Sequence, residues 1–365
     1  NPLPHPEPVW LYPQTLAASS LLVLDGAHLE GGGALVRTAL VMSAATQQGF
    51  QIDDVRGGTR HPGLDPEDVV LLMAVAAACR AETTGVAIGS KSFTFRPTIR
   101  AIKIEDTLPD IRTENNRGSN AAVSLATLAP ILARASAYSS VIATGETYGM
   151  RVLGYDALAG PVAELWRELG LYTYFELGRA GFGRTSDGEI TMEVEPSALK
   201  GIEWIDRGKL RSIKAAIAYK GHSAAADRCL SHLQRLATNT GLKIEGDLIE
   251  VGAADHGMHL TIWARYDKGL GTGAATAARG MRAEGVAQQA FEELFSWMST
   301  PATLDPYLAD HILLPAVLAE GTTSFRTNRL TRRFLTKVWV VKQFTPLHIT
   351  VRGSEDGPGH VTIQR

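Results

Sequence analysis

The chain has 365 residues, enough to bury a large core, and we expect two domains. Apolar residues make up 45%, charged residues 20%, and the net charge is −2, which is typical of a globular protein and excludes the global positive field of many nucleic-acid binders. Any contact with nucleic acid must therefore come from a local basic patch.

Cysteine content and apolar runs exclude two further classes. Cys79 and Cys229 form no CxxC pair, which argues against a disulfide framework or a cysteine zinc site and fits a reducing compartment. The longest strongly apolar run, residues 69–79, is too short to span a bilayer. We therefore expect no membrane segment and an intracellular protein, either cytoplasmic or nuclear.

Residues 1–20 are predicted to form an extended N-terminal arm. This segment shows no signal-peptide pattern, and it is rich in proline: Pro2, Pro4, Pro6, Pro8 and Pro13.

The stretch that follows predicts a strand, a glycine-rich turn, a helix and a second strand. An apolar run at 22–24 ends in Asp25-Gly26, helical periodicity covers 34–47, and residues 51–55 alternate as a strand. Gly31, Gly32 and Gly33 lie between the first strand and the helix. Amide groups at such a turn, together with the helix dipole, favour an anion.

Charged residues flank this turn. Glu30 precedes the glycines, Arg37 lies one turn into the helix, and Arg56 follows the second strand. We expect an anion site here, with Arg60 and His61 extending its positive edge. A turn kept for tight packing, with arginines in solvated salt bridges, is the alternative.

Helices and strands then alternate in three rounds, which predicts a weak threefold repeat of an α/β unit. The first round adds a helix at 65–81 and strands at 86–88 and 92–95. The second has a helix at 121–135, a strand at 140–144 and a helix at 156–169, and the third has helices at 304–318 and 331–343 with strands near 324–325 and 347–351.

A smaller α/β domain is predicted to interrupt the third round. Its expected elements are strands at 213–219, 244–251 and 259–266 and a helix at 222–240. Residues 268–274, KGLGTGA, lack the Gly-Lys-Ser/Thr end of a phosphate-binding P-loop, so we expect a flexible exit loop. The predicted division is an arm at 1–20, a large domain at 21–201 and 277–365, and an inserted domain at 202–276.

Several motifs resemble the RNA 3'-terminal phosphate cyclase family. They are Leu24-Asp-Gly-Ala27, Glu30-Gly-Gly-Gly33, Arg37-Thr-Ala-Leu40, Val55-Arg-Gly-Gly58 and Pro62-Gly-Leu64, with a weaker match at Tyr307-Leu-Ala-Asp310 and Leu314-Pro315. The resemblance implies an α/β protein of repeated βα units with a smaller inserted α/β domain, a fold also similar to that of the enolpyruvyl transferases.

The resemblance also implies a chemistry. These enzymes join a terminal 3'-phosphate to the adjacent 2'-hydroxyl at the expense of a nucleoside triphosphate, through a nucleotide held on a histidine. ATP and Mg²⁺ are the implied cofactors. Glu30 would lie on the metal or phosphate side, and Arg37 and Arg56 would contact phosphate.

The histidine is where the sequence departs from the family. A pattern like His-Leu-Leu-Thr-Asn opens the family's last helix, and the matching stretch here is Arg333-Phe-Leu-Thr-Lys337. Arg333 occupies the histidine position, and a guanidinium stays protonated and cannot attack phosphorus. The family also has a stretch with three consecutive glycines, and the corresponding residues 181–188 lack that triplet. An Asp-Gln pair of the family is replaced here by Asp310-His311. His311 could replace the nucleophile, although a packed or surface histidine is the alternative.

A basic cluster surrounds the start of that last helix: Arg326, Arg329, Arg332, Arg333 and Lys337. Helical spacing would place Arg329, Arg333 and Lys337 on one stripe that could bind RNA phosphates, or the cluster is a solvated helix start.

Three hypotheses remain open. One is a non-catalytic, cyclase-like module that binds RNA or a nucleotide and works with protein partners in ribosomal RNA processing. The others are an active ATP-dependent cyclase and an altered small-molecule enzyme on the same scaffold.

Overall fold

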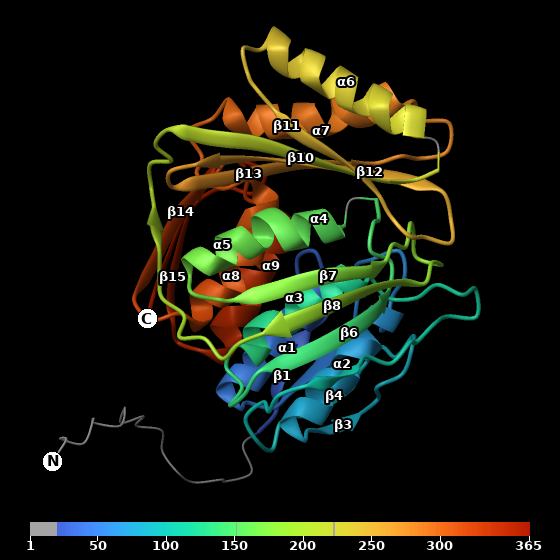
Figure 1. Ribbon diagram of the computed structural model, residues 1–365. Helices are drawn as coiled ribbons and strands as arrows, with labels where there is room; N and C mark the ends of the chain where they lie inside the picture. The colour runs from blue at the N-terminus through green and yellow to red at the C-terminus, as the bar shows by residue number, and fades with distance from the viewer. Residues whose placement is uncertain (1–19, 151, 222) are drawn as a thin grey trace, which may run out of the picture.

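The computed structural model describes residues 20–150, 152–221 and 223–365, so the predicted arm lies outside the described residues except for Ser20. Three units in the described chain share one topology, in which two helices alternate with strands and a hairpin closes a four-stranded sheet. In each sheet the order is first, second, fourth and third strand of the unit, and the first two strands are parallel. The predicted threefold repeat is therefore confirmed (Figure 1).

The elements of the three units follow one another along the chain. The first unit comprises β1 (Leu22–Asp25), α1 (Gly33–Thr46), β2 (Phe50–Asp53), α2 (Pro66–Cys79), β3 (Glu82–Thr84) and β4 (Phe93–Arg96). The second comprises β5 (Glu105–Thr107), α3 (Ala121–Leu132), β6 (Ser139–Gly145), α4 (Tyr155–Ala157), the π-helical turn η1 (Leu158–Val162), α5 (Ala163–Glu168), β7 (Thr173–Arg179) and β8 (Gly188–Val194). The third comprises β9 (Glu203–Trp204), α8 (Pro306–Leu318), β14 (Thr322–Thr327), α9 (Arg332–Phe344), β15 (His348–Gly353) and β16 (Gly359–Gln364).

A fourth sheet interrupts the third unit between β9 and α8. It contains β10 (Leu210–Lys220), β11 (Glu245–Glu250), β12 (Gly257–Tyr266) and β13 (Gly269–Thr276), with helices α6 (Ser223–Asn239) and α7 (Ala283–Met298). Both helices lie on the outer side of this sheet, at the top of Figure 1. Its separate apolar core draws its buried residues from between Ile213 and Ala302, which includes α7 beyond the predicted boundary at residue 276. The domain boundaries themselves stay a prediction.

Two local predictions are wrong. Residues 268–274 do not form an exit loop, because β13 pairs along its length with β12 and is largely buried. The glycines of this strand allow a close approach to α7, since a Cβ at Gly273 would lie 2.1 Å from the carbonyl oxygen of Ala290. The strand predicted at 86–88 is instead turn and irregular chain, and β3 lies earlier, at Glu82–Thr84.

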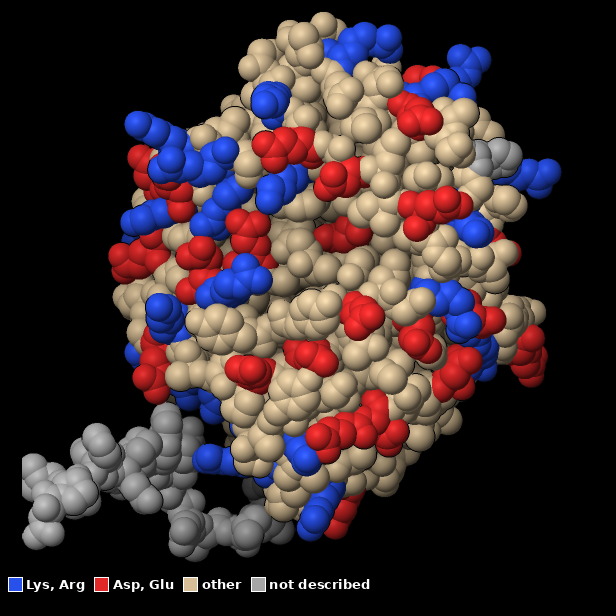
Figure 2. All heavy atoms as spheres, viewed as in Figure 1, with Lys and Arg blue, Asp and Glu red and all other residues tan. Residues whose placement is uncertain are grey.

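The large core positions the first helix of each unit at the centre of the molecule. α1, α3 and α8 contact one another pairwise and are buried along most of their length, and α9 packs on α1. The sequences of α1, α3 and α8 are nearly continuous apolar runs because these helices are covered on most sides. Charges of both signs are interspersed over the visible face of the surface (Figure 2). Among the described residues, the helices are all too short or too polar to cross a membrane.

Candidate functional site

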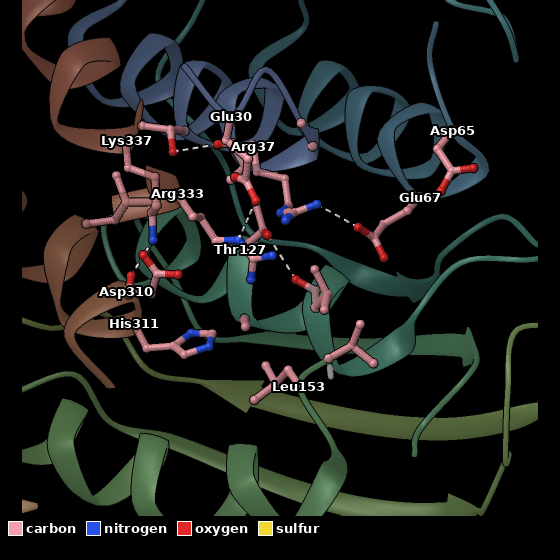
Figure 3. Close-up of a pocket in the computed structure, with 18 of the residues that line it drawn as sticks. Glu30, Arg37, Asp65, Glu67, Thr127, Leu153, Asp310, His311, Arg333 and Lys337 are labelled. Carbon is pink, nitrogen blue, oxygen red and sulfur yellow. Dashed lines mark hydrogen bonds and ion pairs between the residues drawn. The ribbon is translucent and has the colours of Figure 1, made fainter. Parts of the chain in front are cut away.

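A cavity of about 360 Å³ lies where the first helices of the three units meet. α1, α3 and α8 each contribute wall residues, and α9 completes the wall with Arg333 and Lys337. Figure 3 shows the charged side chains gathered on one side of this central cavity. Glu30, Gly32, Gly33, Arg37, Arg56, Tyr307, Asp310, His311 and Arg333, nine of the residues predicted from sequence, line it together.

The predicted glycine turn brings two arginines together. Gly33 is the first residue of α1, and a Cβ built there would lie 2.5 Å from one Nη atom of Arg56 and 2.7 Å from one of Arg37. A side chain at this position would displace both guanidinium groups. Gly31 has a positive φ of 58°, which favours glycine in the turn before it. The turn therefore lets two guanidinium groups reach the start of a helix, where backbone amides and the helix dipole already favour an anion.

Carboxylates at the start of α2 hold these two arginines in place. Arg37 donates to Glu67 at 2.6 Å, and Arg56 pairs with the fully buried carboxylate of Asp68 at 2.8 Å. α2 begins here because Asp65 and Asp68 form a capping box ahead of Pro66. Burial raises the pKa of Asp68, and the positive charges of Arg56 and Arg37 oppose that increase. The arginines are thus fixed in direction before any ligand arrives.

Two further cavity arginines were missed from the sequence. Arg184 donates to Asp65 at 2.8 Å, and Arg117 reaches the same carboxylate oxygen at 3.4 Å. Arg184 lies in the 181–188 stretch, between the second unit's hairpin strands, and Arg117 lies in the polar turn before α3. The signal that could have found Arg117 is its place: it precedes the first helix of its unit, as Glu30 does in the first unit.

The start of α9 forms the opposite wall. Arg333 donates to Glu30 at 3.2 Å, and the backbone N–H of Glu30 donates to the Thr336 hydroxyl at 3.1 Å. Lys337, one turn further along α9, donates to the backbone carbonyl of Asp310. Burial lowers the pKa of Lys337, and Asp310 opposes that decrease. The two contacts of Glu30 join segments some 300 residues apart.

The remaining wall is largely apolar and comes from α3 and α8. It is lined by Val123, Ala126, Thr127, Pro130, Leu314 and Pro315. His311 faces the cavity (Figure 3), and its ring meets the Tyr307 ring edge to face at 4.8 Å between centroids. Burial lowers the pKa of His311 well below its usual value, and the charges of Lys337, Arg333 and Arg37 add to the effect. His311 is therefore a neutral imidazole at ordinary pH.

Two carboxylate oxygens on the cavity wall could serve a cation. Glu30 Oε2 and Asp310 Oδ1 are buried and have no hydrogen-bond partner among the described residues. The described part of the chain contains no group of three or more metal-ligating side chains. Mg²⁺ commonly binds through one or two carboxylates together with substrate phosphates, so this donor set fits a metal brought in with a phosphate ligand.

The structure places four predicted site residues outside this cavity: Gly31, in the turn before α1, and Arg60, His61 and Arg329. Arg60 and His61 are exposed on the loop after Arg56. Arg329 precedes α9, which is capped by Thr331, so the predicted helical stripe of Arg329, Arg333 and Lys337 is wrong. Arg329 and Arg333 nevertheless line a neighbouring cavity together.

Known proteins match this chain over nearly its whole length. The family model described as RNA 3'-terminal phosphate cyclase matches residues 28–351. The RNA 3'-terminal phosphate cyclase of Methylococcus capsulatus is 31% identical over 355 residues, which cover 94% of this chain and 96% of that protein. The protein of the same name from Koribacter versatilis is 30% identical over 342 residues, covering 92% and 93% of the two chains.

A solved structure aligns more distantly. The enolpyruvyl transferase NikO from Streptomyces tendae gives a TM-score of 0.39 at 11% identity, and the alignment covers 94% of this chain and 48% of that chain.

Proposed function

Because the chain belongs to the RNA 3'-terminal phosphate cyclase family, we propose that it binds an RNA end that carries a phosphate, or a nucleotide, in the central cavity. The observation that carries this proposal is the convergence of Arg37 and Arg56 on Gly33 at the start of α1. Arginines fixed by carboxylates suit phosphate oxygens because their planar forks match that geometry.

The charged wall and the apolar wall of the cavity would contact different parts of the ligand. Phosphates lie at the Gly33 turn, between Arg37 and Arg56 on one wall and Arg333 on the other. The apolar wall of α3 and α8 suits a base and sugar, because nucleotide pockets combine apolar surface with a few placed polar groups. ATP is the nucleotide we propose, and only in the alternative of an active cyclase would it supply an activated nucleotidyl group. Glu30 and Asp310 would hold the accompanying Mg²⁺ through their free oxygens.

We propose further that the chain works without a covalent nucleotidyl-histidine. Arg333 stands where the resemblance implies the nucleophile, and its guanidinium donates to Glu30. A permanently charged group there can hold a phosphate but cannot attack one. The protein would then bind the RNA end in an RNA-processing assembly, such as one acting on ribosomal RNA inside the cell, with protein partners.

Incubation with ATP labelled at the α-phosphate tests this point. We expect the wild-type protein to retain no label after denaturation, because the cavity wall at this place offers no nucleophile. Arg333→His restores the imidazole on the same helix turn, and this variant should acquire label if the rest of the cavity is competent. Mass spectrometry would locate the adduct.

One outcome favours the second candidate function, an active cyclase. His311 is neutral and faces the cavity, so it has a free ring nitrogen that could attack phosphorus. A stable adduct on His311 in the wild-type protein, absent in His311→Gln, would restore the enzyme hypothesis and refute the non-covalent one.

A further inference from the structure

A separate cavity, of about 1040 Å³, lies at one end of the inserted unit. Its walls are the end of β10, the start of β12, the beginnings of α6 and α7, and the chain between β13 and α7. Its described wall residues all differ from those of the central cavity and of the neighbouring cavity at Arg329. A ligand in this cavity would therefore occupy a site of its own.

Positive side chains dominate the wall of this cavity. Its charged residues, with one carboxylate among them, are Lys220, Arg228, Arg279, Arg282 and Glu284. Glu284 pairs with Arg228 at 3.5 Å, whereas the other three cations form no ion pair within 4.0 Å with any residue that the structure describes. The wall therefore has an excess of positive charge that is available to a ligand.

α6 and α7 run in the same direction, so both present their N-termini to this cavity. Arg228 of α6 pairs with Glu284 of α7. One turn further along each helix, His232 Nε2 lies 3.3 Å from Gln288 Oε1. The equal spacing of these contacts along both helices requires parallel neighbours. Their dipoles therefore add at the cavity, and both favour an anion there.

The start of α7 departs from the usual charge preference of a helix N-terminus. Arg282 occupies the N-cap position without a side-chain hydrogen bond to the first turn, and Arg279 lies three residues before it. N-caps are normally Ser, Thr, Asp or Asn, and the helix dipole repels a cation at this end. Such departures from local rules are expected at functional sites. An anion between the two arginines and the amide groups of the first turn would satisfy both.

The remaining wall of the cavity is largely apolar. Tyr219, Ala225, Met258 and Met281 line it. Methionine side chains adapt to ligands of different shapes, and a few placed charges on an apolar wall are typical of small-molecule sites. The cavity therefore suits a ligand that combines phosphates with an apolar part.

Acidic residues beside the cavity limit the length of that ligand. Glu250 is the partner of Tyr219 in the pairing of β11 with β10. Asp227 precedes Arg228, and Asp255 precedes the wall residue His256. All three carboxylates are on exposed residues. A long polyanion that extends from the cavity would meet these negative charges, whereas a compact one would not.

We propose that the inserted unit binds a compact polyphosphate in this cavity. The two sources with this chemistry are a nucleoside di- or triphosphate and inorganic pyrophosphate, which share a diphosphate group. The diphosphate binds between Arg279 and Arg282 at the start of α7, and Lys220 and Arg228 add positive charge. This inference is independent of the proposed function, which concerns the central cavity. An RNA strand is the competing occupant.

Arg282→Asp gives the sharpest test, because it should separate stability from binding. Aspartate is a favoured N-cap and complements the helix dipole, so the unliganded variant should melt at a higher temperature than the wild type. The same change replaces attraction by repulsion, so the affinity for pyrophosphate should fall at least about tenfold in calorimetry. Arg235→Asp is the matched control, since Arg235 is exposed on α6 two turns beyond Arg228 and outside this cavity. It should bind as the wild type does and gain no stability.

Hydrogen exchange locates the binding, because pyrophosphate could also enter the central cavity. With divalent cations removed by EDTA, pyrophosphate should protect the amides of residues 283–286 in the wild type but not in Arg282→Asp. Any protection of residues 33–36 at the central cavity should be the same in both proteins. ADP in the same assay distinguishes the two sources. Tighter binding than that of pyrophosphate supports the site with a nucleoside on the apolar wall, and equal binding supports it with the diphosphate alone.

Two results would overturn the inference. One is an absence of protection at residues 283–286 in the wild type, or an equal affinity of the wild type and Arg282→Asp for pyrophosphate. The other is protection by an oligouridylate without a terminal phosphate, but not by pyrophosphate or ADP, which would make the occupant RNA. Protection at residues 283–286 without any at residues 33–36 would support this site and count against the proposed function.

Discussion

Gly33→Ala should abolish tight phosphate binding. The added Cβ would lie 2.5 and 2.7 Å from the guanidinium nitrogens of Arg56 and Arg37, closer than such atoms can approach. Both contacts are with the far ends of flexible side chains, so the arginines move and the backbone stays. Each charge-assisted hydrogen bond lost to a phosphate costs roughly 1.5–3 kcal/mol. Loss of one therefore raises Kd on the order of 10- to 100-fold.

Stability should fall as well, because the guanidinium nitrogens that must move are the ones that pair with Glu67 and with the fully buried Asp68. Gly32→Ala is the matched control. Its Cβ would meet only the Glu30 side chain, at an ordinary 3.7 Å. Alanine is a poor N-cap, so this variant should lose up to about 1 kcal/mol of stability and keep its affinity.

Calorimetric titration with ATP and with pyrophosphate, beside thermal unfolding, would distinguish the two variants. We expect both variants to lose some stability but only Gly33→Ala to lose affinity. Wild-type affinity in Gly33→Ala would refute the reasoning and reduce the glycine turn to a packing feature.

Three further predictions follow from the same structure. Arg37→Ala should weaken phosphate-ligand binding by roughly 1.5–3 kcal/mol. Arg60 is exposed outside the cavity, so Arg60→Ala should leave the affinity unchanged. Equal affinities of the two variants in calorimetry would contradict the site. Replacing Arg329 and Arg333 by Gln should flatten the salt slope of RNA binding by roughly one to one and a half units, and a collapse of thermal stability instead would make Arg333 a structural residue. Burial raises the pKa of Asp156 from 3.8 to about 6. Between pH 3.8 and about pH 6 the folded protein therefore keeps a proton on Asp156 that the unfolded chain has lost. The free energy of unfolding should fall as the pH rises through this range. Asp156→Asn removes this loss. The free energy of unfolding of the variant minus that of the wild type, measured by chemical unfolding, should be up to about 3 kcal/mol larger at pH 7 than at pH 4. An equal difference at both pH values would contradict this prediction.

Local pattern was sufficient for most of the fold. Apolar periodicity and capping signals located α1, α2, α8 and α9 within a few residues, because each combines a buried face with a recognisable start. β13 was missed because its glycines, which signal a loop in isolation, are there to admit α7. Only tertiary packing distinguishes those two uses of glycine.

The sequence predicted the site residues that are close to one another along the chain and missed those that come from another unit. Glu30, Arg37 and Arg56 follow neighbouring strands of one sheet, so their meeting could be expected. Arg117 and Arg184 enter the cavity from the second unit through a shared contact with Asp65. Sequence spacing carries no information on such pairing between units.

The contact between Glu30 and α9 also bears on the order in which parts of the molecule fold. Synthesis from the N-terminus exposes the arginines of α1 long before α9 exists, and during that interval Glu30 lacks both Arg333 and Thr336. The cavity is closed by contacts of very long sequence separation, which form late because loop closure must precede them. Hydrogen exchange during refolding would then show the amide of Glu30 protected among the last. The phosphate site that we propose would therefore be complete only when the chain extends through α9, which ends at Phe344.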